Sequence, residues 1–193
     1  MDFCPTIFDL DGTLADTMPA HFEAWQQVCA RYGFAFPESD FYAWGGVPTH
    51  EIARRLIARN GLQLSFEAIA EEKESHVEKL LQNPGGVARI EPVIAIAKAL
   101  HEKGLPIGIG SGGTRSLVEK TLQIAGISEL FRVVVAYEDT VKHKPDPDVF
   151  LEVARRLGAP PADCVVYEDS ESGFAAARAA GMRFVDARNL RKK

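Results

Sequence analysis

A short apolar segment ends in two acids and a glycine in the stretch Thr6-Ile7-Phe8-Asp9-Leu10-Asp11-Gly12-Thr13. The apolar residues predict a buried strand. Side chains alternate along a strand, so Asp9 and Asp11 share one face while the backbone stays extended. Two carboxylates this close tend to retain a proton unless a cation is present, and Mg2+ prefers oxygen ligands. The stretch alone leaves two interpretations open, a magnesium site or two solvated acids before a turn.

Length and composition restrict the class of protein. A chain of 193 residues fits one domain, or one domain that carries a smaller inserted one. The net charge of -5 disfavours non-specific binding to nucleic acid or to anionic membranes. The three cysteines, Cys4, Cys29 and Cys164, match no metal or redox spacing, so we expect small buried side chains in a reducing compartment. With no secretory signal and no apolar run of about 18 residues, we expect a soluble, cytoplasmic protein.

The first half of the chain has helical periodicity after its opening strand. We expect a helix over 16–32, a loop over 34–48, a helix capped by Thr49 that ends at Gly61, and a helix capped by Ser65 that runs to about residue 82. The sequence Asn83-Pro84-Gly85-Gly86 then predicts the end of this last helix.

The second half alternates helices with strands. We expect helices from about Pro92 to Gly104, over 114–125, from Pro147 with Asp146 as its cap, and over 172–180. We expect strands over 105–110, 132–136, 164–167 and 184–185. A frayed basic tail is expected over 188–193. This alternation predicts an α/β fold, a Rossmann-like parallel sheet with helices on both faces. We assign residues 1–14 and 84–193 to this core domain, and 15–83 to an inserted all-helical cap domain.

Polar residues follow the predicted strands at the edge where ligands bind in such sheets. Ser111 lies in a glycine-rich turn before a helix, Lys144 precedes a proline, and Glu168 and Asp169 end an apolar strand. Each has a plain alternative: a helix cap, a solvated lysine, or an acidic first helical turn. Their placement at successive strand ends favours one common site.

These residues resemble the four motifs of the haloacid dehalogenase superfamily: Asp9-x-Asp11-Gly-Thr, Ser111, Lys144-Pro and Glu168-Asp169. The similarity spans essentially the whole chain. The helical insertion resembles the subfamily with a helical cap that contains β-phosphoglucomutases and sugar-phosphate phosphatases. The segments 46–49, 141–145 and 173–182 are similar to the fructose-1-phosphate phosphatase type.

The resemblance implies a role for each motif. Asp9 would be the nucleophile that forms an aspartyl-phosphate, and Asp11 would act as general acid and then general base. Mg2+ would bind the Asp9 carboxylate, the Asp11 carbonyl and Asp169, with Glu168 either a ligand or a partner through water. Ser111, the Gly112 amide and Lys144 would hold the phosphoryl oxygens.

The insertion is expected to act as a lid that selects the leaving group. His21, Gly46 and Thr49 are its candidate substrate contacts, while Trp25, one turn after His21, is expected in the core more than at the cleft. The segment 44–50 lacks the basic residues with which phosphomutases of this group hold a second phosphate. The resemblance therefore implies a Mg2+-dependent phosphatase acting on a small sugar phosphate such as fructose-1-phosphate. The alternatives are a β-phosphoglucomutase-type mutase and a non-enzymatic phospho-receiver or phosphate-binding module. We expect a monomer whose partner is a small phosphoester, with no nucleic-acid or membrane partner.

Overall fold

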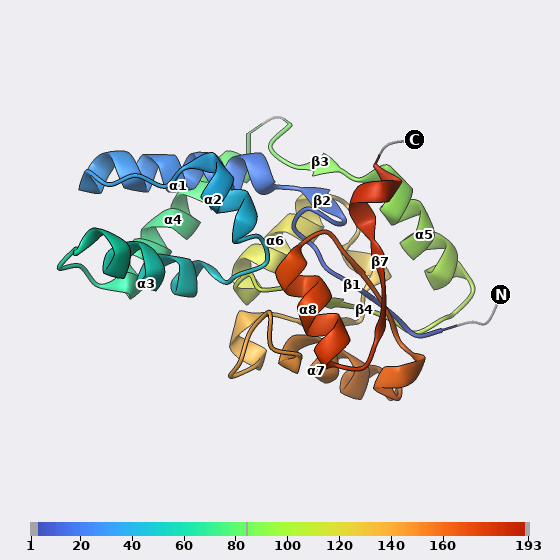
Figure 1. Cartoon of the computed structure of the whole chain (residues 1–193). Helices are drawn as coiled ribbons and strands as arrows, with labels where there is room; N and C mark the ends of the chain where they lie inside the picture. Colours follow the sequence, from blue (N-terminus) through green and yellow to red (C-terminus); the bar gives the residue numbers. More distant parts are fainter. Residues whose placement is uncertain (1–3, 84, 192–193) are drawn as a thin grey trace.

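A five-stranded parallel sheet organises the molecule (Figure 1). Its strands are β1 (Thr6–Phe8), β4 (Ile107–Gly110), β5 (Val133–Val135), β6 (Val165–Glu168) and β7 (Arg183–Asp186), in the order β5-β4-β1-β6-β7. The central strand β1 pairs with β4 and β6, and its residue Ile7 lies opposite Gly108 and Val166. The computed structural model describes residues 4–83 and 85–191.

Helices cover both faces of the sheet. On one face α5 (Glu91–Glu102) and α6 (Arg115–Ile124) pack around Phe8. On the other face α7 (Asp148–Leu157) and α8 (Glu171–Ala179) pack around Ile7. The two neighbouring residues serve opposite faces because strand side chains alternate. The expected parallel sheet with helices on both faces is confirmed.

Four helices form a separate layer beside this core (Figure 1). They are α1 (Met18–Tyr32), α2 (Glu38–Ala43), α3 (Thr49–Asn60) and α4 (Phe66–Leu81), and they share their own apolar cluster around Trp25 and Leu56. The two connections to the core run antiparallel as β2 (Ala15–Asp16) and β3 (Ala88–Arg89). The domain boundaries at 14/15 and 83/84 stay a prediction, and residue 84 lies outside the described residues.

Helix α2 corrects the expected loop over 34–48. Its six residues are too few to show periodicity, and it forms because Phe41 is buried against Phe36 and Tyr42. The short strands β2 and β3 and the 3-10 turns η1 (Ser128–Leu130), η2 (Tyr137–Asp139), η3 (Pro161–Asp163) and η4 (Ala187–Leu190) were also not predicted.

Two expected helix caps are wrong, whereas the Ser65 cap is confirmed by its hydrogen bond from Ala68 N. Thr49 is the first residue of α3, after Pro48, and its hydroxyl makes no capping bond. Asp146 lies one residue before the N-cap Pro147 of α7, and it is therefore too early in the chain to cap the helix.

The basic tail and the first cysteine also differ from expectation. Residues 187–190 form η4 instead of fraying, and Arg188 pairs with Asp186 and Glu171. Residues 192–193 of the predicted tail lie outside the described residues. Cys29 and Cys164 are buried as expected, but Cys4 is only partly buried and its Sγ accepts a hydrogen bond from Arg183. In the part of the chain that the structure describes, no helix is both long and apolar enough to cross a membrane.

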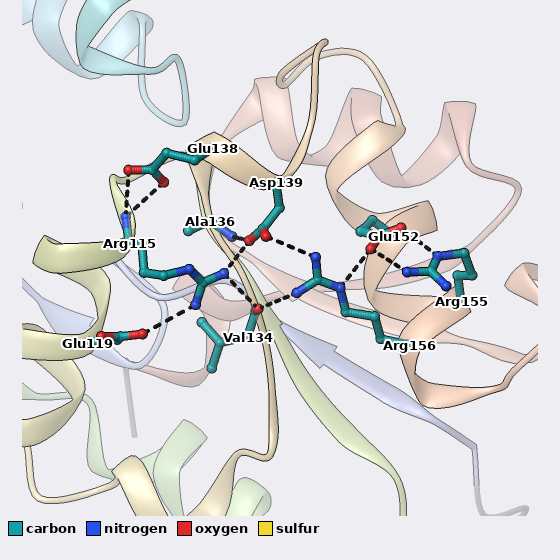
Figure 2. Close-up of polar contacts among 9 residues, drawn as sticks. All are labelled: Arg115, Glu119, Val134, Ala136, Glu138, Asp139, Glu152, Arg155 and Arg156. Atoms are coloured by element: carbon teal, nitrogen blue, oxygen red, sulfur yellow. Dashed lines mark hydrogen bonds and ion pairs between the residues drawn. The ribbon is translucent and has the colours of Figure 1, made fainter.

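Two arginines protect the edge strand β5 (Figure 2). The Val134 carbonyl oxygen accepts hydrogen bonds from Arg115 of α6 at 3.3 Å and from Arg156 of α7 at 3.1 Å. The Asp139 carboxylate binds both guanidinium groups and the Ala136 N–H. Burial opposes ionisation of Asp139, but the Ala136 N–H and Arg156 hold its pKa below the ordinary value. This network occupies the Val134 carbonyl of the edge strand, which could otherwise accept a hydrogen bond from a strand of another molecule.

Asp139→Ala should destabilise the protein by about 1.5–3 kcal/mol, because two guanidinium groups and one N–H lose a charged acceptor. Equilibrium urea unfolding at pH 7 measures the change. The stabilisation is present above the ordinary carboxyl pKa and is lost as the pH falls, since protonation removes the ion pairs. The matched control is Glu119→Ala, because among the described residues Glu119 makes only an exposed pair with Arg115 and its loss should change stability by less than about 1 kcal/mol. Equal effects of the two substitutions would contradict this account.

Candidate active site

The carboxyl ends of β1 and β6 and the loop before α7 bring three charged groups together. Nζ of Lys144 lies 2.6 Å from Oδ1 of Asp9 and 3.2 Å from Oε1 of Glu168. All three side chains are nearly inaccessible to solvent, with exposed fractions of 1–7%. Burial alone would lower the pKa of Lys144, but the two carboxylates raise it above its ordinary value. Lys144 therefore remains an ammonium group that fixes the Asp9 carboxylate.

Two threonines orient the other acids. Thr17 donates a hydrogen bond of 2.6 Å to Oδ1 of Asp11, and Thr13 donates one of 3.1 Å to Oδ1 of Asp169. Gly12 lies between these groups with φ of +90°, and a Cβ at this position would come within 2.3 Å of Asp169 Oδ2. Only glycine allows both this backbone conformation and this close approach. Thr17 had no sequence signal, because its role depends on the turn after Asp11.

The acids fit a hard divalent cation. Asp9, Glu168 and Asp169 each offer a carboxylate oxygen, and these oxygens lie within 4.8 Å of one another. Burial, reinforced by Glu168, raises the pKa of Asp169 to about 7. Burial also raises the pKa of Asp9 well above its ordinary value, although Lys144 acts in the opposite direction. Such carboxylates become ionised together most readily beside an added positive charge, and an all-oxygen donor set suits Mg2+.

The remaining predicted metal residues differ in their surroundings. The Asp11 carboxyl group does not belong to this cluster within the described residues, and its contribution through the backbone carbonyl stays a prediction. Glu168 already accepts hydrogen bonds through both oxygens, from Lys144 and from the N–H and Oγ of Ser170. This engagement favours a role for Glu168 in holding its neighbours over direct ligation.

The glycine-rich turn after β4 lies beside the acids. Ser111 is buried, and its Oγ accepts a hydrogen bond of 3.0 Å from the Gly113 N–H. Gly112 and Gly113 line the same cavity as Asp9 and Asp11. The predicted phosphate contact of the Ser111 hydroxyl is therefore accompanied by a local role, which is to shape the turn that presents the backbone of Gly112.

The helical layer contributes a polar trio to the cavity wall. Nζ of Lys73 in α4 lies 2.8 Å from Nδ1 of His21 in α1 and donates a 3.1 Å bond to the Thr49 hydroxyl. Burial and the nearby ammonium hold the pKa of His21 well below its ordinary value. A neutral His21 that accepts at Nδ1 carries its proton on Nε2, which lies 3.7 Å from Asp11 Oδ1 and has no hydrogen-bond partner among the described residues.

Sequence reasoning missed Lys73. The available signal was its position four residues after Ile69 and four before Val77, on the apolar face of α4. A lysine on such a face is surrounded by core residues and has to find its partners there.

Apolar side chains form the rest of the wall. The cavity is lined by residues that include Met18, Trp25, Phe41, Trp44 and Ile52. Trp25 therefore meets both expectations, since it is 1% exposed and also borders the cavity. The predicted contacts His21, Gly46 and Thr49 lie in this lining together with Asp9, Asp11 and Asp169. The site thus joins an acidic floor on the sheet to an aromatic lid with one buried ammonium.

Buried Lys73 gives stability a defined dependence on pH. Burial lowers its pKa from the ordinary 10.5 to about 8, although Glu74 and Asp11 oppose the shift. Between these values the unfolded chain binds more protons than the folded one, so stability rises with pH. The free energy of unfolding of the wild type, relative to Lys73→Met, should increase by up to about 3 kcal/mol from pH 7 to pH 10. Chemical unfolding of both proteins tests this, with the exposed Lys79→Met as control; a constant difference would contradict it.

Comparisons with known proteins agree with this architecture. The profile of the haloacid dehalogenase-like hydrolases matches residues 6–187. The fructose-1-phosphate phosphatase YqaB of Escherichia coli is 39% identical over 95% of this chain and 96% of its own length. A phosphorylated carbohydrates phosphatase of Thermotoga maritima is 32% identical over 91% of this chain and 81% of its own.

A solved structure shares the fold. It is a β-phosphoglucomutase from Clostridium difficile, with a TM-score of 0.84 and 23% identity, which covers 94% of this chain and 83% of that one. The predicted enzyme class, a phosphatase of the haloacid dehalogenase type, is confirmed by the family match and the two phosphatase relatives. The chain belongs to the haloacid dehalogenase-like hydrolase family.

Proposed function

We propose that the protein hydrolyses the phosphate monoester of a small sugar or polyol, with fructose-1-phosphate as the first candidate, through an aspartyl-phosphate at Asp9. One observation carries the proposal: Nζ of Lys144 lies 2.6 Å from Oδ1 of Asp9, and Asp9 and Asp11 both line a cavity roofed by the helical layer. The sequence of the Escherichia coli fructose-1-phosphate phosphatase supports the choice of sugar phosphate. The proposal includes a monomeric enzyme that acts on a free small molecule.

The reaction divides into two displacements at phosphorus. An Asp9 carboxylate oxygen attacks the phosphorus atom, and the bond to the substrate oxygen breaks as that oxygen takes a proton from Asp11. Burial raises the pKa of Asp11, although the Thr17 hydrogen bond lowers it, so burial favours the protonated form that the first displacement needs. Ionised Asp11 then removes a proton from water, which attacks phosphorus and frees Asp9. The Gly112 amide and Lys144 hold the phosphoryl oxygens.

Mg2+ would be held by the carboxylates of Asp9 and Asp169 and by the Asp11 carbonyl, with Glu168 supporting the group. When bound, the ion supplies positive charge to the phosphoryl oxygens and lets the buried acids remain ionised together. Thr13 and Gly12 contribute by setting the position of Asp169 against the turn that carries Asp11.

The lid composition supports a hydroxylated leaving group. Lys73, His21 and Thr49 offer hydrogen bonds from one side of the cavity, and the ring of Trp25 lies beneath the ammonium at 5.9 Å. Aromatic surface beside a few fixed polar groups is the usual composition of a site for a small polar ligand. Lys73 thus extends the set of specificity residues beyond the predicted His21, Gly46 and Thr49.

The surroundings of the segment 44–50 favour hydrolysis over phosphoryl transfer to a second sugar phosphate. His50 stacks on Tyr137, Arg54 packs on Phe66 at 3.7 Å, and Arg55 pairs with Glu51. These basic side chains are therefore engaged elsewhere instead of lining the cavity. A mutase would need a basic side chain from this segment to hold its second phosphate, whereas the Lys73 ammonium on the cavity wall comes from α4 and already bonds His21 and Thr49.

Phosphate release from fructose-1-phosphate and from p-nitrophenyl phosphate tests the proposal. We expect turnover that requires Mg2+, stops with EDTA and returns with excess Mg2+. β-Glucose-1-phosphate with a trace of the bisphosphate should yield inorganic phosphate and little glucose-6-phosphate. Dominant glucose-6-phosphate would indicate the mutase instead. No turnover in a panel of phosphoesters would favour a phospho-receiver or phosphate-binding module.

A further inference from the structure

Three stacked rings join the helical layer to the core beside the cavity. His50 is the second residue of α3, Tyr137 begins η2, and His143 immediately precedes Lys144. The ring centroids of His50 and Tyr137 lie 4.8 Å apart with an interplanar angle of 11°. Those of Tyr137 and His143 lie 4.2 Å apart at 21°. The phenol ring is therefore held between two imidazoles from different segments.

Each ring is tied to a different wall of the cavity. On the lid side, the neighbour of His50 is Thr49, whose hydroxyl accepts the Lys73 hydrogen bond. On the core side, the neighbour of His143 is Lys144, which holds Asp9. Between them, the backbone N–H of Tyr137 donates a 2.9 Å bond to the carbonyl of Gly113, in the turn that borders the acids. Sliding of the stack would therefore move the lid wall relative to both phosphoryl-binding segments.

Other contacts tie the layers together at different places. Ser172 Oγ at the start of α8 donates a 2.6 Å bond to the carbonyl oxygen of Gly45, and Thr114 donates a 3.0 Å bond to Glu74 of α4. Lys120 of α6 also pairs with Glu78 of α4, and Leu117 of α6 packs against Val77 and Leu81 of α4. The helical layer and α8 approach closely at the Ser172–Gly45 contact, since a Cβ on Gly46 would lie 2.4 Å from Ser172 Oγ. The polar contacts can exchange with water and the apolar contact sets no ring orientation, whereas stacked rings have a preferred geometry that fixes how the two layers are oriented.

We propose that His50, Tyr137 and His143 form a latch that positions the lid over the Lys144–Asp9 pair and sets the fraction of molecules with a closed cavity. The latch residues contact neither the phosphoryl group nor the leaving group; they act through Thr49, Gly113 and Lys144. The kinetic consequence rests on the proposed phosphatase function, whereas the closure itself does not.

The direction of the kinetic effect follows from the equilibrium between open and closed forms. Substrate binds the closed form, so the apparent affinity falls in proportion to the closed fraction, while saturating substrate still closes the lid. Loss of the stack should therefore raise KM and leave kcat nearly unchanged. A group that takes part in the reaction itself would instead lower kcat.

Tyr137→Leu and Tyr137→Phe form the decisive pair, because Phe keeps the stacked ring and Leu removes it. For Tyr137→Leu we expect KM for fructose-1-phosphate to rise about tenfold with kcat within twofold of wild type. Amide hydrogen exchange without substrate should be at least fivefold faster in peptides that cover 49–60 and 140–146. Tyr137→Phe should match wild type in both measurements. His50→Leu removes the lid ring alone and should give the same changes in KM and exchange. It replaces Tyr137→Leu in the test if Tyr137→Leu folds poorly.

The two measurements separate the latch from the enzymatic function. Wild-type exchange rates and KM in both Tyr137→Leu and His50→Leu would overturn the latch, whatever the substrate. Absence of wild-type turnover would refute the phosphatase proposal, while faster exchange in the leucine variants, rescued by phenylalanine, would still support the latch. Equal acceleration of exchange in Tyr137→Phe and Tyr137→Leu would show that stacking is not the cause.

Discussion

Asp9→Asn is expected to reduce Mg2+-dependent phosphate release by 10⁴-fold or more, on the order of the loss when an enzyme's nucleophile is removed. An amide is a poor nucleophile, and it also weakens the ion pair with Lys144. Phosphate release from fructose-1-phosphate and p-nitrophenyl phosphate measures the effect, because both substrates need the same nucleophile. The loss should therefore be similar for the two.

The control must separate chemistry from folding. Asp163→Asn alters an exposed acid just before β6, at the amino ends of the strands and away from the cavity. This variant should retain wild-type rates. Thermal unfolding should show both variants folded at the assay temperature. Wild-type turnover in folded Asp9→Asn would refute the assignment of the nucleophile.

Asp11→Asn is expected to slow fructose-1-phosphate hydrolysis by about 10²–10⁴-fold, the usual contribution of general acid–base catalysis, with little change in substrate binding. The sugar alkoxide needs a proton as it leaves, whereas p-nitrophenolate leaves without one. Formation of the phosphoenzyme from p-nitrophenyl phosphate should therefore be much less affected than formation from fructose-1-phosphate. Rapid-quench kinetics with both substrates measures the difference. Equal slowing of that first step with the two substrates would contradict the acid role.

The cluster of acids Asp9, Glu168 and Asp169 was predictable because parallel strands bring their carboxyl ends to the same end of the sheet. Asp9, Lys144 and Glu168 are far apart in sequence, but Asp9 and Lys144 follow strands with a recognisable apolar pattern and Glu168 ends one. Their polar residue types at successive strand ends were enough to predict one site. The parallel sheet and most helices were predictable for the same reason, since their burial follows periodic patterns.

Features that depend on contacts between distant segments were not predictable. Lys73 meets His21 across 52 positions of sequence, and only the packing of α1 on α4 brings them together. The ring of Tyr137 meets partners from two other segments, so no local pattern marks it. Helix α2 is stabilised by the burial of Phe41 instead of by periodicity. Such features need the three-dimensional arrangement.

The central claim is that Asp9 carries the phosphoryl group between two steps, of which the second depends on Asp11. Asp11→Asn with p-nitrophenyl phosphate and Mg2+ tests it most directly, because the first step needs no acid while the second needs a base. We predict a burst of p-nitrophenolate close to one equivalent of enzyme, then slow turnover. Borohydride reduction of the quenched protein converts an aspartyl-phosphate to homoserine with loss of phosphate, so peptide mass spectrometry should find homoserine in place of Asp9. Phosphate release without a burst, or an acyl phosphate on another residue, would contradict the account.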